Sequence, residues 1–160
     1  MIIIESPLLQ DERVGRAIET LREEIPQQRV RVLKPEVIIN LVEDGQPDTY
    51  IFVIANFSGD LFHRLEQTQG SILGNFFGDY YYNTVQYCFL GKSVFLECVE
   101  MGRPLPNPKR PLYCEAFADL MLVFNSTTKT RLMELVNMVH WMGGQVRTDF
   151  LKINEAHFII

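Results

Sequence analysis

Residues 50–55 read Tyr-Ile-Phe-Val-Ile-Ala, an uninterrupted apolar run within a chain of 160 residues. A run without polar alternation is typical of a central parallel strand that helices cover on both faces. The turn residues Asp44-Gly45-Gln46-Pro47 precede it. Leu61, Phe62 and Leu65 follow with the spacing of a helical stripe. The stretch therefore predicts an α/β fold built around this strand.

Strands and helices alternate on both sides of this run. The expected further strands are residues 2–4, 30–33 and 87–90, and the expected helices are residues 11–25, 60–67 and 93–100. Asp11 can cap the first helix and Pro26 ends it. Residues 37–42 fit either a strand or a helical turn. The alternation predicts a small, mainly parallel, four-stranded sheet flanked by helices.

An unusual stretch interrupts the pattern at residues 70–84, with three glycines and five aromatic residues. We interpret it as an inserted loop or as an extension of the preceding helix. It is not a phosphate-binding loop, because no Gly-Lys-Ser/Thr follows the glycines. The aromatic residues at 76–82 either form a partner-binding surface or pack back on the domain.

The pattern restarts after a linker. Residues 102–115 are rich in proline and predict a semi-rigid connection. Residues 116–160 then give a strand at 120–124, a polar turn, a helix, and strands at 145–150 and 156–160. We therefore divide the chain into a first unit (residues 1–101), the linker, and a βαββ second unit (residues 116–160).

Composition excludes several classes of protein. Non-specific nucleic-acid binding needs a basic surface, and the formal net charge is −5. No apolar run approaches the roughly 20 residues that cross a bilayer, and the N-terminus lacks the features of a signal peptide. The three cysteines are odd in number and lie in apolar contexts, as expected of reduced thiols in an intracellular protein.

Catalytic and metal chemistry find little support in the sequence. The cysteines and histidines of the chain lack the close pairing that a zinc site requires. These residues are Cys88, Cys98, Cys114, His63, His140 and His157. The expected strand ends offer Ser6, Asn56 and Asn125, with no acid/base pair among them. We therefore expect no catalytic residue, no cofactor and no metal, and we set aside a small doubly wound enzyme.

The second unit resembles a known family. An apolar strand, a polar turn, a helix ending in Met142-Gly143-Gly144 and a strand with His157-Phe158-Ile159 are similar to the first half of a BRCT domain. In that family the glycine pair turns the chain tightly back into the sheet. Ala156 stands where the family usually has Thr. The resemblance implies a BRCT-like first unit and an incomplete second BRCT unit.

A narrower resemblance extends over residues 88–160. The segments 110–114 (Arg-Pro-Leu-Tyr-Cys), 139–144 and Asp149-Phe150 resemble the tandem BRCT region of the Pebble-type family of cytokinesis Rho guanine-nucleotide exchange factors. Residues 102–106 resemble the segment that leaves the most N-terminal BRCT-like unit of that family. The alternative is a phosphopeptide-binding BRCT scaffold of the DNA-damage or replication response. The segment 110–114 and its spacing to the glycine pair favour the exchange-factor family.

This resemblance implies a regulatory role without enzyme activity. The chain would be a protein-interaction and autoregulatory module that docks on phosphorylated centralspindlin or on the exchange module of the same protein. The 160 residues contain no segment that resembles an exchange module, so we expect no exchange activity from them. The expected location is the nucleus in interphase, and the cytoplasm and spindle midzone in division.

The resemblance also implies where a phosphopeptide would bind. In the family a Ser or Thr at the start of the first helix and a Lys from the second helix hold the phosphate. Here Asn125, Ser126 and Thr127 occupy that helix start with Lys129 behind them, and the second-helix Lys would lie beyond Ile160. A helix N-terminus favours an anion, although Ser126 or Thr127 acting only as a helix cap is the alternative.

A weaker site of the same kind is expected in the first unit. Ser6 holds the equivalent position there, and Arg64 or His63 would replace the Lys. A structural spacer or a protein-docking surface is the alternative for this unit.

Residues 116–160 are too few to bury a sufficient core alone and would leave a strand edge open. We therefore expect this half-unit to pack on the first unit, to pair with a second copy as a dimer, or to come from a longer protein. Trp141 is interpreted as a core residue, with a partner contact as the alternative.

Overall fold

The chain folds around two parallel sheets. The computed structural model describes residues 1–44, 49–75, 87–124, 128–147 and 158–159. The first sheet has the strand order β2-β1-β3-β4, with β1 (Ile2–Glu5), β2 (Val30–Leu33), β3 (Tyr50–Ile54) and β4 (Tyr87–Gly91). All its strands are parallel, and the predicted central strand is β3, which lies between β1 and β4. The predicted α/β class is confirmed.

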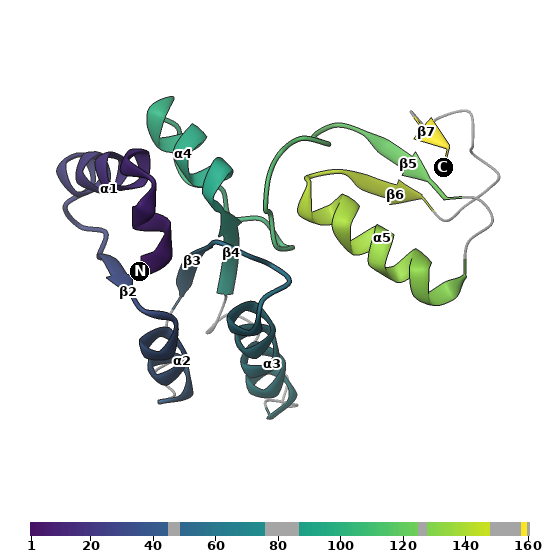
Figure 1. Ribbon diagram of the computed structural model, residues 1–160, viewed down its shortest axis with the longest axis horizontal. Helices are drawn as coiled ribbons and strands as arrows, with labels where there is room; N and C mark the ends of the chain where they lie inside the picture. The colour runs from purple at the N-terminus through teal and green to yellow at the C-terminus, as the bar shows by residue number, and fades with distance from the viewer. Residues whose placement is uncertain (45–48, 76–86, 125–127, 148–157, 160) are drawn as a thin grey trace.

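Helices cover both faces of the first sheet (Figure 1). They are α1 (Glu12–Glu24), α2 (Pro35–Glu43), α3 (Asp60–Asn75) and α4 (Lys92–Glu100). Ile2, Ile4 and Val53 pack with α1 and α4, whereas Ile3 and Phe52 pack with α2 and α3. Successive strand residues point to opposite faces, so each face needs its own apolar set. This explains why the strands read as continuous apolar runs.

Local sequence explains where the helices begin and end. Asp11 caps α1 as predicted, since its carboxylate accepts a hydrogen bond from the Arg13 N–H at 3.0 Å. The undecided residues 37–42 belong to α2, which Pro35 begins. The third helix runs to Asn75, so the unusual stretch starts as a helix extension. Its aromatic residues at 76–82 lie outside the described residues.

The predicted linker is packed against the first sheet along part of its length. We call residues 102–115 the strap. Leu112 forms a parallel bridge with Leu90 of β4. The Leu112 N–H donates to the Phe89 carbonyl and the Gly91 N–H donates to the Leu112 carbonyl, both at 2.9 Å. The strap therefore continues the sheet beyond β4, although its proline content gave no sign of a strand.

The second sheet has the strand order β6-β5-β7, all parallel to β5. Its elements are β5 (Met121–Val123), α5 (Lys129–Trp141), β6 (Gln145–Arg147) and β7 (Phe158–Ile159). Gly143 has φ +82°, a conformation that favours glycine, and a Cβ on Gly144 would lie 2.8 Å from Val139 Cγ1. The glycine pair thus ends α5 as expected. His157 lies outside the described residues.

Candidate functional site

The predicted phosphate site lies at the N-terminus of α5. Asn125, Ser126 and Thr127 lie outside the described residues, and Lys129 is the exposed first residue of the helix. The helix cap is Thr128, whose backbone is extended (φ −66°, ψ 151°). The Arg131 N–H donates to the Thr128 hydroxyl at 3.4 Å. The structure thus assigns the cap of α5 to Thr128.

The first turn of α5 has the electrostatics of an anion site. Its leading N–H groups have no partner within the helix, and the positive end of the helix dipole lies there. Arg131 is held by Glu134 through a 3.0 Å ion pair on the same helix. Lys129 has no carboxylate partner in the described part of the chain. Lys129 is thus the better placed of the two cations to meet an incoming phosphate.

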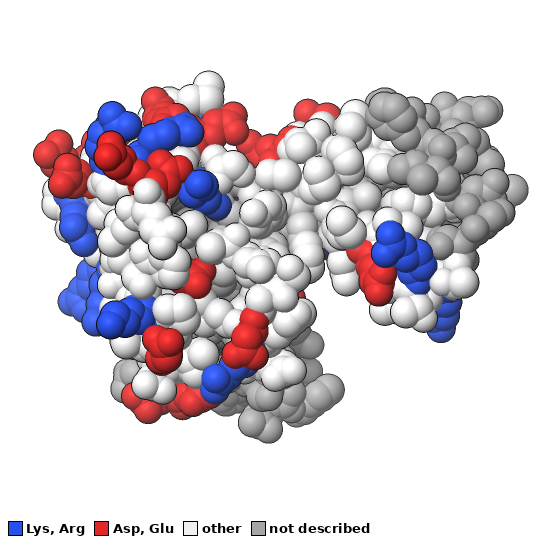
Figure 2. All heavy atoms as spheres, viewed as in Figure 1, with Lys and Arg blue, Asp and Glu red and all other residues white. Residues whose placement is uncertain are grey.

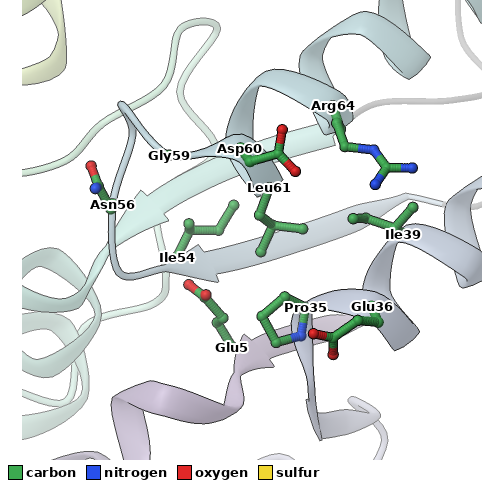
Figure 3. A pocket seen from close by; sticks show the side chains of 10 residues that line it. All are labelled: Glu5, Pro35, Glu36, Ile39, Ile54, Asn56, Gly59, Asp60, Leu61 and Arg64. Carbon is green, nitrogen blue, oxygen red and sulfur yellow. The ribbon is translucent and has the colours of Figure 1, made fainter.

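The first unit holds a cleft where β1 and β3 end (Figure 3). The cleft has a volume of about 310 Å³, and residues at the beginnings of α2 and α3 form the rest of its walls. Ile54 and Leu61 point into its centre, and the carboxylates of Glu5, Glu36 and Asp60 lie around them. This is the switch point of the strand order, because β2 and β3, which follow β1 in the chain, lie on opposite sides of β1 in the sheet.

The two weaker predicted residues are not brought together in this cleft. Ser6 begins a short 3-10 helix, η1 (Ser6–Gln10), and is not among the lining residues. Arg64 lines the cleft, but an ion pair of 3.2 Å links it to Glu43. Ser6 follows β1 directly, and η1 separates it from α1, which begins at Glu12 after the Asp11 cap.

Carboxylates dominate this cleft, and sequence reasoning missed them. Glu5 is 9% exposed, and its Oε2 accepts a hydrogen bond from the Ala55 N–H at 2.9 Å. Glu36 and Asp60 add two further negative charges against the single charge of Arg64. Like charges repel, so the cleft is unfavourable for a phosphate. An acidic residue directly after an apolar strand, as Glu5 follows Ile4, was the available signal.

The two units meet at an aromatic junction. The Trp141 ring lies edge-on to Phe57 and Phe62, with ring centroids 5.7 and 5.8 Å apart. The ring of Tyr113 in the strap also lies edge-on to Phe57, with ring centroids 5.2 Å apart. The Trp141 carbonyl accepts hydrogen bonds from the N–H groups of Tyr113 (2.7 Å) and Cys114 (3.1 Å). Trp141 thus packs against the core of the first unit, as in the first of the three alternatives given for residues 116–160.

The residues that the structure describes contain no group of three or more His, Cys, Asp or Glu side chains placed to hold a metal ion. Among these same residues, no helix has both the length and the apolar content needed to span a membrane.

Comparison with known proteins gives two significant relatives. The chain is 33% identical over 101 residues to Protein ECT2 of Homo sapiens and 33% identical over 100 residues to Protein ECT2 of Mus musculus. Each match covers 62% of this chain and 9% of the relative, so the chain spans less than a tenth of these curated proteins. No family model matches. The similarity agrees with the resemblance predicted from the sequence, and the parallel four-stranded sheet with its flanking helices is consistent with a BRCT-like fold.

Proposed function

We propose that this chain is a protein-interaction and autoregulatory module of a Rho guanine-nucleotide exchange factor that acts in cytokinesis. The observation that carries the proposal is the 33% identity to Protein ECT2 over 101 residues. Its docking partners would be phosphorylated centralspindlin or the exchange module of the same protein. The BRCT-like sheet is consistent with this role, although a fold alone does not fix a function.

The start of α5 is the proposed docking point for the phosphate. Helix N–H groups and the dipole attract an anion there, and Lys129 adds an exposed positive charge. Ser126 and Thr127 precede the Thr128 cap and would supply hydroxyl donors. The carboxylate-lined cleft of the first unit is unsuited to a phosphate. Of these two places, only the start of α5 is therefore expected to bind one.

A binding titration tests the docking role. The chain is titrated with a phosphorylated centralspindlin peptide and with its unphosphorylated twin, by calorimetry or fluorescence anisotropy. We expect binding that depends on the phosphate and weakens about tenfold in Ser126→Ala, Thr127→Ala or Lys129→Gln, the equivalent of one charge-assisted hydrogen bond.

Arg131→Gln is the matched control. It removes a positive charge from the same helical turn, but the charge that it removes is already paired with Glu134. Equal weakening by Lys129→Gln and Arg131→Gln would show a diffuse charge effect and contradict a site at the helix start. Equal binding of both peptides would contradict phosphate recognition altogether.

The autoregulatory role needs a separate assay. The chain is added to the isolated exchange module of the human relative while nucleotide exchange on Rho is followed. Inhibition that rises with the concentration of the chain, and that the phosphopeptide relieves, is the expected result. An unchanged exchange rate at saturating chain would refute the autoregulatory part and leave the docking part standing.

A further inference from the structure

A second cationic feature lies at the opposite end of α5. Arg110 of the strap reaches His140 in the last turn of the helix, and its Nη1 lies 2.6 Å from the His140 Nε2. Two hollows, of about 480 and 460 Å³, both have Arg110 and His140 in their walls. Lys109 lines the second hollow. We call Lys109, Arg110 and His140 the notch.

The two cationic side chains of the notch, Lys109 and Arg110, differ from other cations of the chain in their ion pairing. Five other described cations form ion pairs with carboxylates, namely Arg13, Arg64, Lys92, Arg103 and Arg131. Neither Lys109 nor Arg110 has a carboxylate partner within the described residues. Glu115 lines the same hollow, but it lies 3.9 Å from Arg103. The notch therefore presents two cationic side chains that are not neutralised by an ion pair.

The contact fixes the protonation of the histidine. A guanidinium can only donate, so the His140 Nε2 must accept and the imidazole must be neutral. Burial, and then the Arg110 charge, lower the pKa of His140. Other charged groups nearby are Lys109 and Glu115 on the strap and Arg147 on β6, two residues beyond the lining residue Gln145. An anion in the notch would oppose the lowering and allow His140 to become a third donor.

We propose that the notch binds a phosphate group carried on a protein segment. Lys109 and Arg110 would bind its oxygens, and protonated His140 would donate from Nε2. The hollows are far larger than a phosphate, and Leu112, Val136 and Val146 give them apolar walls that suit side chains flanking a phosphorylated residue. A free phosphate would leave these walls uncovered, so a peptide is the expected ligand.

The notch is separate from the phosphate site proposed at the start of α5. Lys129 and His140 are eleven positions apart on α5, which corresponds to about 16 Å along the helix axis. The inference does not rest on the proposed function, because no residue is shared between the two sites. Their tests are distinguished by Lys129→Gln, which alters only the helix start, and Arg110→Gln, which alters only the notch.

The test uses a phosphoserine peptide with leucine on both sides of the phosphoserine, its unphosphorylated twin, and inorganic phosphate alone. Binding is measured from pH 7.5 to 6.0, and the His140 ring is followed by NMR with assignment from His140→Gln. We expect the phosphopeptide to raise the pKa of His140, and to lose about tenfold in affinity in Arg110→Gln and in His140→Gln. Circular dichroism of each variant verifies that it is folded.

Several results would overturn the inference. Unchanged affinity in folded Arg110→Gln, or a pKa of His140 that the phosphopeptide does not move, would exclude the notch. A loss confined to Lys129→Gln would assign all binding to the helix start. Inorganic phosphate that binds as tightly as the phosphopeptide would show a site for an adventitious ion only.

Discussion

Replacing Gly91 by alanine should separate the strap from the first sheet. Gly91 has φ −79° and ψ 164°, so its backbone conformation suits any residue. The obstacle is space, because an added Cβ would lie 2.0 Å from the Tyr113 carbonyl oxygen and 2.7 Å from its carbon. Since contacts below 3.0 Å do not occur at real Cβ atoms, the strap backbone must move by about 1 Å.

The size of the effect follows from the contacts that this movement disrupts. They are the hydrogen bonds from the Gly91 N–H to the Leu112 carbonyl, from the Leu112 N–H to the Phe89 carbonyl and from the Ser93 hydroxyl to the Tyr113 carbonyl, and the ring contact of Tyr113 with Phe57. At about 1 kcal/mol for each hydrogen bond and about 1 kcal/mol for the ring pair, the loss is about 3–4 kcal/mol. That is a large share of the about 5–15 kcal/mol that stabilises a typical domain.

Urea unfolding followed by tryptophan fluorescence measures this loss. Trp141 is the single tryptophan of the chain and lies at the junction of the units, so its emission reports on their contact. The control is Gly15→Ala, because a Cβ there would meet no atom within 4 Å beyond its chain neighbours and the backbone of its own helix, and the helical position should gain up to about 1 kcal/mol. A free energy of unfolding for Gly91→Ala within about 0.5 kcal/mol of the unaltered chain would refute the reasoning.

Three further predictions test other parts of the structure. Gly144→Ala should destabilise the chain by about 1–3 kcal/mol in urea unfolding, because its Cβ would overlap the Val139 side chain. The Lys92 hydrogen bond, then that of a backbone N–H, lowers the pKa of Asp11, so this carboxylate stabilises the fold above its ordinary pKa of 3.8 and loses that effect as the pH falls through the lowered value. Lys92→Gln should move the pKa of Asp11 upward in an NMR titration, and an unmoved pKa would contradict the ion pair. Burial raises the pKa of Cys88 to about 11, so mass spectrometry after iodoacetamide treatment at pH 8 should show Cys114 alkylated before Cys88.

The sheet and most of its helices could be predicted because their signals are local. The apolar run at 50–55 marks the central strand, and Asp11 marks a helix start. The α2 segment could not be decided, since nine residues hold too few turns for a helical period to differ from a strand. Residues 70–84 could not be assigned to a loop or to a helix extension, because Gly70 and Gly74 weaken the helical signal, and α3 continues through both positions to Asn75.

The contacts between units could not be predicted, because they join residues that lie far apart in the sequence. The pairing of Leu112 with Leu90 adds a single bridge, which leaves no strand pattern among the prolines of the strap. The Arg110–His140 contact likewise spans 30 positions. The acidic cleft depends on Glu5 and Asp60 meeting at one end of the sheet, which only the strand order reveals.

The backbone pairing of the strap with β4 sets an order of events during synthesis. β4 is complete when Gly91 has been added, but its outer neighbour Leu112 follows roughly 20 residues later, or about 1–4 s at usual rates of translation. Once β4 has left the ribosome, it stays an open edge on the nascent chain for an interval of that length, and an open edge pairs readily with other strands. Chains released from the ribosome just before residue 112 should therefore aggregate more than chains released after residue 120, which sedimentation of the translation products would measure.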